Sequence, residues 1–386
     1  MLDVTGGWAM TQVDCVAANP RTRENRDQKD QRKKLRMLAY QHQSDGIQRL
    51  VDLPEAKAAP GGLLIDVVAS GICGTDLKIA RGEHRMYPVG TVRVPGHEFT
   101  GIVAENNSGR ADLAPGTAVA VAPNIACRAC AACRAGKENL CENYESFGLT
   151  FNGGFARRVT APAAAVEAGN ILPVPSGLDL ATASLMEPVA AVVRGLRPLG
   201  LRPTDTVLVC GAGPMGLITL IVAKQMGVAQ VLVSQTSPTR RELATQFGAD
   251  ATFDPRAADL SEQVMAYTDG WGADAVVAAT PKAQVFADAL RCAAIGGRIN
   301  FFAGLPSSAG AIPLEANLIH YKELIVTGST ANSNADCEEA LGIVAQAPEL
   351  FAPLITDRLP LEQADEAFAR AAAGKEFKVI LEPQAS

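Results

Sequence analysis

Hydrophobic residues follow two different patterns along this 386-residue chain. In the first half they form short runs of aliphatic and β-branched residues, at Leu63–Ala69, Gly101–Ala104 and Ala118–Ala122. Turns rich in Gly, Pro and Asn separate these runs. Short apolar runs bounded by turn residues are typical of strands. We therefore expect a β-rich domain that begins at about Met37.

From about Leu201 the apolar segments alternate between strand-like and helix-like patterns. The segments in this alternation are Thr206–Cys210, Leu217–Met226, Val231–Val233, Pro238–Phe247, Ala275–Ala279, Phe286–Ala293 and Arg298–Ala303. Strands and helices in turn predict a parallel sheet with helices on both faces, which is an α/β fold. The tail from about Leu324 to Leu381 has mixed character, and we expect it to return to the first domain. The predicted division is 37–188 with 325–386 for one domain and 189–324 for the other.

The first 36 residues differ from the rest of the chain. Asn19–Arg36 is dense in Arg, Lys, Asp and Glu and contains almost no apolar residue. Such a segment cannot bury enough apolar surface to offset the entropy that it would lose on ordering. We expect 1–36 to be a flexible N-terminal extension, with a basic targeting or binding arm as the alternative.

The composition narrows the class of protein. Hydrophobic residues make up 48% of the chain, charged residues 20%, and the formal net charge is −6. An acidic balance argues against a nucleic-acid partner, which needs clustered positive charge. No apolar run reaches the length of a membrane span, and the N-terminus lacks a signal-peptide pattern. Nine cysteines, four of them in one loop, fit metal sites in a reducing compartment, so we expect a cytoplasmic protein.

Four of these cysteines predict a metal site. Cys127, Cys130, Cys133 and Cys141 follow the order C-x2-C-x2-C-x7-C. Four thiolates on one short loop match the closed tetrahedral site that zinc prefers. A pair of disulfides or an iron–sulfur cluster would use the same residues, because cysteine order alone does not choose between them. The spacing predicts a structural zinc site and leaves these two alternatives open.

A glycine-rich loop joins the first predicted strand of the second domain to its first helix. Its order is G-x-G-x-x-G, and in this context the glycines allow a tight turn, a close approach to a pyrophosphate and close packing of helix on strand. The helix N-terminus then offers free N–H groups and a positive dipole to the phosphates. The loop therefore predicts an NAD(P) site. The residues expected to contact the cofactor here are Gly211, Gly213, Pro214, Met215 and Gly216.

The end of the next predicted strand bears on which dinucleotide binds. An acidic residue there bonds the ribose 2′-OH of NAD. This chain has Gln235 instead, a neutral amide that does not repel a 2′-phosphate. Arg240 or Arg241 could pair with such a phosphate. The pattern gives a slight preference for NADP over NAD.

Three segments before the glycine loop carry candidate ligands for a second metal ion. Cys73 follows a predicted strand, His97 and Glu98 follow a Pro-Gly pair, and Glu187 precedes a proline just before the second domain. A thiolate, an imidazole and a carboxylate supply the three protein ligands of an open zinc site, in which water or substrate takes the fourth place.

The ligand candidates, the cysteine loop and the glycine loop occur in one order along the chain. That order resembles the zinc-dependent medium-chain dehydrogenase/reductase family, and most closely its polyol branch, which includes sorbitol and threonine dehydrogenases. The resemblance covers nearly everything from Met37 to Leu381. It implies a GroES-like catalytic domain, a Rossmann NAD(P)-binding domain and an active site in the cleft between them.

The resemblance also implies roles for single residues. The positions that match the catalytic zinc ligands are Cys73, His97 and Glu187. A glutamate at position 187 is typical of the polyol branch, and Glu98 matches an acid that coordinates the metal directly or through water. Asp76 matches the acid that orients the histidine ligand, and Thr75 matches a hydroxyl that passes the alcohol proton toward solvent.

The implied reaction is hydride transfer between NAD(P) and a secondary alcohol, such as a polyol or sugar derivative. Two zinc ions per subunit and a homotetramer or homodimer are implied with it. Lys78 stands where several relatives have histidine, and Ser329–Asn332 lacks the arginine that positions polyols in sorbitol dehydrogenases, which argues against sorbitol. An L-threonine or other amino-alcohol dehydrogenase and an inactive NAD(P)-binding sensor are the alternatives. Candidates for the substrate pocket, each with loop packing as the alternative, are His84, Arg85, Tyr87, Phe147, Phe151, His320 and Tyr321.

Overall fold

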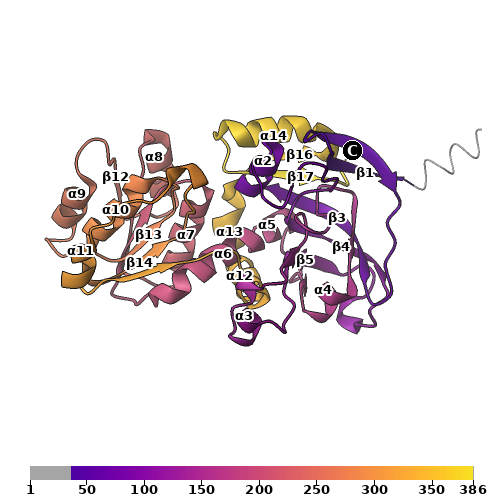
Figure 1. The fold of residues 1–386 in the computed structure, drawn as a ribbon, viewed down its shortest axis with the longest axis horizontal. Helices are drawn as coiled ribbons and strands as arrows, with labels where there is room; N and C mark the ends of the chain where they lie inside the picture. Colours follow the sequence, from indigo (N-terminus) through magenta and orange to yellow (C-terminus); the bar gives the residue numbers. More distant parts are fainter. Residues whose placement is uncertain (1–35, 386) are drawn as a thin grey trace, which may run out of the picture.

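The structure is a computed structural model that describes residues 36–385. The extension predicted at 1–36 lies outside the described residues, apart from Arg36. Figure 1 shows two lobes side by side, with α6 (Met186–Leu196), α12 (Asn334–Gln346) and α13 (Pro348–Phe351) where they meet. Among the described helices, none combines the length and the apolar character needed to cross a bilayer.

The first lobe is built around a seven-stranded sheet in the order β16-β17-β3-β4-β5-β9, with β8 paired to β3. Its central strand is longer than the predicted Leu63–Ala69 and runs on to Ile72, which carries the chain directly to Cys73. The strands are β3 (Leu63–Ile72), β4 (Glu98–Asn106), β5 (Ala118–Val121), β8 (Arg158–Ala161), β9 (Ile171–Pro173), β16 (Ile355–Pro360) and β17 (Lys378–Glu382).

Two small antiparallel ribbons and several short helices complete this lobe. One ribbon pairs β1 (Arg36–His42) with β2 (Gln48–Pro54). The other pairs β6 (Asn124–Ile125) with β7 (Glu145–Ser146), and it holds together the two ends of the cysteine loop. The helices are α2 (Gly74–Ala80), α3 (Ala131–Arg134), α4 (Ala163–Glu167), α5 (Leu180–Ala183) and α14 (Ala364–Ala373).

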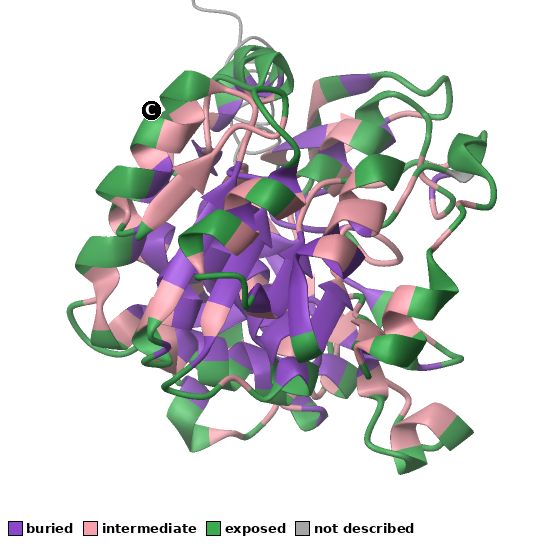
Figure 2. Cartoon of the chain, turned by 90° about the vertical axis from the view of Figure 1, so that its left-hand side faces the viewer, coloured by how far each residue is buried: buried purple, intermediate pink, exposed green. Residues whose placement is uncertain are grey.

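The second lobe contains a six-stranded parallel sheet in the order β12-β11-β10-β13-β14-β15. Figure 2, which looks onto this lobe, shows buried strands covered by helices whose outer surfaces are exposed. The order reverses between β10 and β13, and ligands bind at such a switch point in doubly wound sheets. The strands are β10 (Thr206–Cys210), β11 (Gln230–Ser234), β12 (Ala251–Phe253), β13 (Ala273–Ala278), β14 (Ala293–Phe301) and β15 (Ile325–Gly328). The helices are α7 (Pro214–Gln225), α8 (Pro238–Gln246), α9 (Leu260–Tyr267), α10 (Ala283–Cys292) and α11 (Ala316–Tyr321).

The domain boundary predicted at 324/325 needs a correction. β15 lies in the segment that the sequence assigned to the first domain, yet it pairs in parallel with β14 and completes the second sheet. Val326 on this strand packs against the core beneath that sheet. The strand joins this sheet because β14 has a free edge beside that core. The end of the tail returns to the first lobe, where β17 pairs with β3, while α12 and α13 lie where the two lobes meet.

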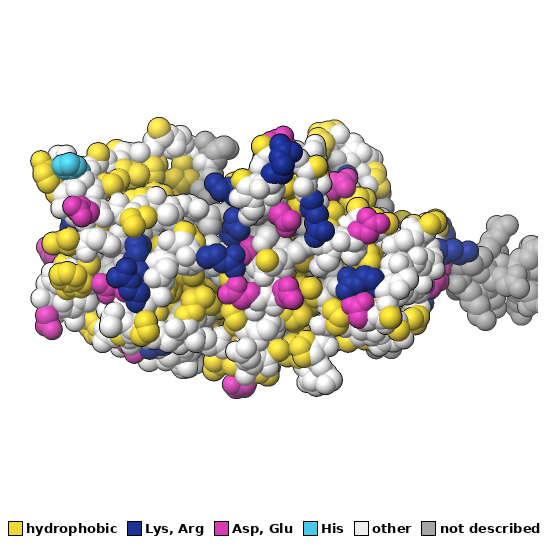
Figure 3. Space-filling view, turned by 90° about the horizontal axis from the view of Figure 1, so that it is seen from below, with side chains coloured by type: hydrophobic (Ala, Val, Ile, Leu, Met, Phe, Trp, Pro, Cys, Tyr) yellow, Lys and Arg dark blue, Asp and Glu magenta, His cyan; other side chains and the backbone are white. Residues whose placement is uncertain are grey.

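A single hydrophobic core continues from one lobe into the other. Its buried members include Ala120 on β5, Val189 on α6, Val209 on β10 and Leu217 on α7. Helix α6 packs on β4 of the first sheet and on α7 of the second lobe, and its first turn lies at the junction. On the surface seen from below in Figure 3, Lys and Arg side chains are interspersed with Asp and Glu, so that face has mixed charge.

Candidate active site

Cys73 is held in place by the helix that follows it. It is the N-cap of α2, and its Sγ accepts a hydrogen bond from the backbone N–H of Thr75 at 3.2 Å. In return, Asp76 Oδ2 accepts from the backbone N–H of Cys73 at 3.0 Å. This reciprocal pattern is a capping box, which fixes the entry of the chain into the helix. The thiol is therefore fixed at the end of the central strand β3.

His97 and Glu187 reach the same place from other elements. His97 directly precedes β4 and is 8% exposed, and its Nε2 lies 3.2 Å from Cys73 Sγ. Glu187 lies in the first turn of α6. The ligand atoms of His97, Glu98 and Glu187 lie within 4.8 Å of one another, as do those of Cys73, Asp76 and His97. His97 thus belongs to both groups, whereas Cys73 and Glu187 are in different groups.

Asp76 lies within ion-pair distance of His97, the residue that the resemblance implied it orients, but forms no hydrogen bond with it. The distance from Asp76 Oδ1 to His97 Nδ1 is 3.8 Å, which is too long for a hydrogen bond. Asp76 Oδ1 instead accepts from the backbone N–H of Gly96 at 3.3 Å. Because its other oxygen accepts from Cys73, this buried carboxylate joins the two loops that carry the thiol and the imidazole.

Glu98 is paired with a lysine that the sequence did not suggest. Lys378 Nζ donates to Glu98 Oε2, and the two side chains are 5% and 3% exposed. Lys378 begins β17, and it reaches this point because β17 pairs with β3 beside β4. The pairing places a fixed positive charge behind the candidate metal ligands.

The charges of the site fit a divalent cation. Burial raises the pKa of Cys73, Asp76 and Glu187, because each group is more easily buried neutral. With Glu98 these residues form four potential anions against the one ammonium of Lys378. A divalent cation bound among them offsets that excess and favours their ionised forms.

The donor set and its spacing fit zinc. Sulfur, imidazole nitrogen and carboxylate oxygen are the donors that zinc takes in proteins. A tetrahedral zinc would separate its sulfur and nitrogen donors by about 3.6 Å, and Cys73 Sγ and His97 Nε2 are 3.2 Å apart. Burial lowers the pKa of His97, but the charges of Cys73 and Asp76 raise it well above its usual value. A metal ion would compete with that proton for the imidazole.

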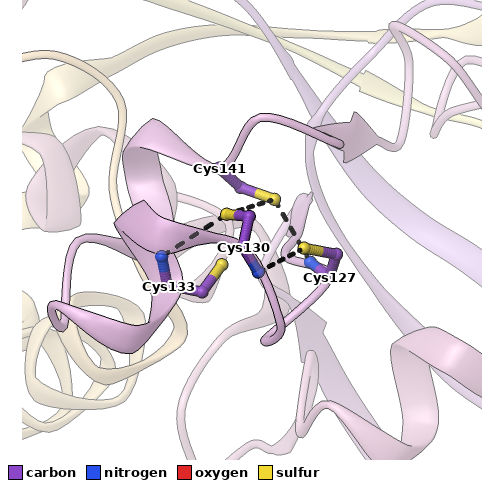
Figure 4. A group of neighbouring side chains, drawn as sticks. All are labelled: Cys127, Cys130, Cys133 and Cys141. Atoms are coloured by element: carbon purple, nitrogen blue, oxygen red, sulfur yellow. Dashed lines mark hydrogen bonds between the residues drawn. The ribbon is translucent and has the colours of Figure 1, made fainter.

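The cysteine loop forms a second, separate cluster. Figure 4 shows the four side chains turned toward one another. Their sulfur atoms all lie within 4.8 Å of one another, and Cys130 Sγ is 4.0 Å from Cys141 Sγ. Four thiolates around one zinc ion would be about 3.8 Å apart. All cysteines of the described chain are free thiols, so the structure fits one tetrahedral ion and not the alternative of two disulfides.

The backbone of the glycine loop packs closely against its neighbours, and its glycines place no side chains in the way of a phosphate. Gly211 has a φ of 122°, which favours glycine, and a Cβ there would overlap Thr280 Oγ1. A Cβ on Gly216 would overlap the carbonyl oxygen of Gly211. Gly213 is the N-cap of α7 and has no side chain to occupy the first N–H groups of the helix. Those groups remain available for a phosphate.

A cavity of about 680 Å³ borders this loop, and its lining includes four predicted cofactor residues, Gly211, Gly213, Gln235 and Arg240. The other three, Pro214, Met215 and Gly216, form the first turn of α7. Gln235 Oε1 accepts a hydrogen bond from the backbone N–H of Ser237 at 3.1 Å. The side-chain oxygen of Gln235 is therefore already bonded within the segment that follows β11.

The arginines near Gln235 have different surroundings. Arg240 Nη2 donates to the carbonyl of Gly374 at 2.6 Å, which ties the cofactor lobe to the other lobe. Arg241 is paired with Asp254 at 3.0 Å. Arg256, which sequence reasoning missed, also lines the cavity, and its side chain is 65% exposed.

A second cavity, of about 500 Å³, opens beside the first metal cluster. Among the candidate pocket residues, His84 and Arg85 line it together with Thr75. The buried Tyr87 instead donates its hydroxyl to the carbonyl of Gly148. Phe147 and Phe151 pack in the core of the first lobe, and His320 and Tyr321 lie on α11, outside the lining. The lining consists of Thr75, His84, Arg85, Met86, His97, Asn124, Asn139, Leu140, Cys141, Tyr144, Ser146, Leu149, Glu187, Thr330 and Ala331.

Comparison with known proteins identifies the family. Residues 59–174 match the alcohol dehydrogenase GroES-like domain, and residues 214–346 match the zinc-binding dehydrogenase family. An L-threonine 3-dehydrogenase from Pyrococcus abyssi is 33% identical over 335 residues, which covers 86% of this chain and 94% of that protein. This chain belongs to the zinc-dependent medium-chain dehydrogenases. The predicted α/β fold, with a GroES-like domain and a Rossmann domain, is confirmed.

Other similar proteins agree with the polyol branch of this family. An L-galactonate-5-dehydrogenase from Escherichia coli is 34% identical over 326 residues, covering 84% of this dehydrogenase and 90% of that protein. The crystal structure of a putative zinc-binding dehydrogenase from Sinorhizobium meliloti, bound to NADP, has a TM-score of 0.82 and 32% identity. That match covers 90% of this dehydrogenase and 99% of the other chain. The prediction of a zinc- and NAD(P)-dependent oxidoreductase is confirmed at this level.

The sequence did not predict a chain of hydrogen bonds in the wall of the cavity of this dehydrogenase. Tyr144 donates to Asn124 Oδ1, and Asn124 Nδ2 donates to Asn332 Oδ1 at 2.7 Å. Asn332 Nδ2 in turn donates to Glu187 Oε1 at 2.7 Å. These residues are far apart in the sequence and belong to no common motif, so no sequence signal marks them. Together they orient the glutamate of the candidate metal site.

Proposed function

We propose that this dehydrogenase oxidises a secondary alcohol of a polyol or sugar derivative, and reduces the matching ketone in the reverse direction. The observations that carry the proposal are the 3.2 Å contact of Cys73 Sγ with His97 Nε2, the grouping of His97 with Glu187, and the cavity that His97 and Glu187 line. Zinc held by these three residues would act as a Lewis acid on the substrate oxygen. The nicotinamide of NAD(P) supplies the hydride chemistry.

The protein's own residues then have distinct tasks. Thr75 lines the cavity and is placed to take up the proton of the substrate hydroxyl and release it toward solvent. Asn332 holds Glu187 in one orientation by its hydrogen bond. Lys378 holds Glu98 by an ion pair, so this acid is fixed beside His97 and Glu187. The four cysteines at 127, 130, 133 and 141, whose sulfur atoms cluster, would hold a second, structural zinc.

The cofactor preference proposed here is a slight one for NADP(H). Gln235 carries no negative charge, while Arg240 and Arg256, the latter paired with Asp254 at 3.3 Å, line the same cavity and would suit a 2′-phosphate. Initial rates measured with NAD⁺ and NADP⁺ at equal, subsaturating concentrations test this point. A strong preference for NAD⁺ would contradict it.

We also propose a homodimer or homotetramer in the cytoplasm. The outer edge of β15 is unpaired within the described chain, and Ile325 and Ile295 near it are 54% and 65% exposed. An exposed apolar strand edge is normally covered by a partner, and here the partner would be a second copy. Sedimentation of the protein and of Ile325→Lys tests this: a monomeric wild type contradicts it. The cytoplasmic location rests on the free thiols, which persist in a reducing compartment.

The test of the main proposal combines metal content with rates. We expect two zinc ions per chain, loss of one ion and of nearly all activity in Glu187→Ala, and no change in the control Glu145→Gln, an exposed carboxylate on β7. Mild chelation should remove the ion at Glu187 first, because a carboxylate replaces a thiolate there. A Glu187→Ala variant with two zinc ions and wild-type rates would refute the assignment.

A second candidate function is the oxidation of L-threonine, because L-threonine 3-dehydrogenases are among the similar proteins. The metal and cofactor sites serve either reaction equally. Rates with threonine and with a panel of polyols and sugar acids separate the two. Oxidation of threonine without oxidation of any polyol derivative would favour this second candidate.

A further inference from the structure

The cavity beside the candidate zinc ligands has one permanent positive charge in its wall. Among the described residues that line it, Arg85 is the only arginine or lysine. It lies in the loop between α2 and β4, and its side chain forms no ion pair and no hydrogen bond with another described residue. An exposed guanidinium at the wall of a substrate cavity is available to an anion.

The neighbouring arginines already have hydrogen-bond or ion-pair partners within the protein. Arg81 pairs with Glu83 at 2.9 Å. Arg93 donates to the carbonyls of Met86 and Leu149, and its guanidinium lies over the ring of Tyr87. Arg85 thus differs from them in having no protein partner of its own.

The rest of the lining is rich in neutral hydrogen-bonding groups. The hydroxyls of Thr75 and Thr330 have no hydrogen-bond partner among the described residues, whereas Tyr144, Ser146, Asn124 and Asn139 are already bonded within the protein. Groups of this kind suit the hydroxyls of a polyol. A hydroxyl both donates and accepts a hydrogen bond, and an amide has a donor and an acceptor side by side. The cavity therefore offers the free hydroxyls of Thr75 and Thr330 to a polyol and one guanidinium to an anion.

Neither a second cation nor a free acid accompanies Arg85. Burial, followed by the charges of His97, Lys78 and Arg85, lowers the pKa of His84, so this imidazole is neutral near pH 7. The only carboxylate in the lining is Glu187, which is bonded to Asn332 and belongs to the metal cluster. The cavity has no free carboxylate to pair with the ammonium group of a substrate. A phosphate dianion carries two negative charges, and Arg85 would balance only one of them.

We infer that the substrate is a polyhydroxy monocarboxylic acid whose carboxylate binds Arg85 while a secondary hydroxyl reaches the metal cluster. This inference rests on the proposed dehydrogenase function. The C–H and O–H bonds of one secondary alcohol break: the hydride goes to NAD(P)⁺ and the proton leaves through Thr75. A keto acid and NAD(P)H are formed, and the carboxylate is unchanged. Arg85 is thus a specificity-determining residue, not a catalytic one.

The experiment uses the zinc-loaded, full-length enzyme and pairs of substrates that differ only at one end. Sugar acids such as galactonate and gluconate are compared with galactitol and sorbitol, with galactitol 1-phosphate and L-threonine as further arms. The variants are Arg85→Met, Arg85→Lys and, as a control in the same loop, Arg81→Met. Thermal melting of each variant checks that the fold is intact.

The expected result is a wild-type kcat/KM at least 10-fold higher for one or more sugar acids than for the matching alditol. Arg85→Met should lower kcat/KM for the acid by about 10- to 100-fold, mainly through KM, because a charge-assisted hydrogen bond is lost. Rates on the alditol should stay within about twofold, Arg85→Lys should keep part of the preference, and Arg81→Met should behave as the wild type.

Three results would overturn the inference. They are equal use of acid and alditol with no effect of Arg85→Met, a preference for the phosphorylated alditol, and a preference for threonine. In the first two the enzyme still oxidises a polyol or its derivative, so the proposed function survives and the carboxylate assignment alone fails. If the zinc-loaded enzyme oxidises no alcohol at all, both fail together.

Discussion

Removing Lys378 should destabilise the first lobe, because it would leave a buried carboxylate without its partner. The lysine and Glu98 are 5% and 3% exposed and form an ion pair. Replacement by methionine keeps the length and most of the volume of the side chain but removes the charge. The variant Lys378→Met therefore tests the charge with little change in packing.

Two estimates give the size of the effect. Breaking a buried pair by removing one partner costs about 3–5 kcal/mol. Coulomb attraction between unit charges about 3 Å apart, at an effective dielectric constant of about 20, is about 5 kcal/mol. With a urea slope of about 3 kcal/mol/M, a loss of this size moves the unfolding midpoint down by about 1–2 M.

The dependence of this effect on pH has a definite sign. Burial lowers the pKa of Lys378, but the negative charge of Glu98 outweighs it, and the pKa is raised. A raised pKa means that the stabilisation is complete below the unfolded value of about 10.4 and is lost as pH rises through the higher folded value. The difference in stability between wild type and Lys378→Met should therefore be constant from about pH 6 to about pH 9.

Urea unfolding followed by circular dichroism, with saturating zinc, measures both quantities. The double variant Lys378→Met/Glu98→Gln removes both charges and should recover most of the lost stability, because no unpaired buried charge remains. The reasoning is refuted if Lys378→Met is as stable as the wild type. It is refuted equally if the double variant is no more stable than the single one.

Three further predictions concern the other sites. Gly216→Ala should raise the Kd for NAD(P)H at least 10-fold, because its Cβ meets the carbonyl of Gly211; unchanged binding in a fluorescence titration would contradict this. Cys130→Ser should lower the zinc content by one ion per chain and lower the melting temperature, whereas two ions found by elemental analysis would exclude a structural site there. Arg256→Met should raise KM for NADP⁺ about 10-fold and leave KM for NAD⁺ unchanged, and equal effects on both would remove this residue from the 2′-phosphate site.

The features that could be predicted from the sequence are those that depend on residues close together in the chain. The strand Thr206–Cys210 has the predicted bounds, and the glycine loop follows it at once. The four cysteines lie within fifteen residues of one another, so their spacing alone brings them together. Cys73, His97 and Glu187 lie far apart, and the resemblance to a family, not their spacing, joined them.

The features that could not be predicted depend on sheet pairing. Lys378 and Glu98 are 280 residues apart and meet only because β17 pairs with β3. Asn332 and Glu187 are 145 residues apart and meet through the loop after β15. The short apolar run Ile325–Gly328 does not reveal which of two sheets it joins. A local pattern gives the type of an element, whereas its neighbours depend on the rest of the fold.

The position of β17 has a consequence for how the molecule is made. The sheet of the first lobe needs residues 378–382 beside its central strand, although most of its other strands come before residue 174. The second lobe is synthesised in between as one continuous stretch. It can therefore complete its sheet before the ribosome has synthesised the last strand of the first lobe. The central strand that ends at Cys73 therefore gains one of its neighbours late, because pairing across so long a separation is slow.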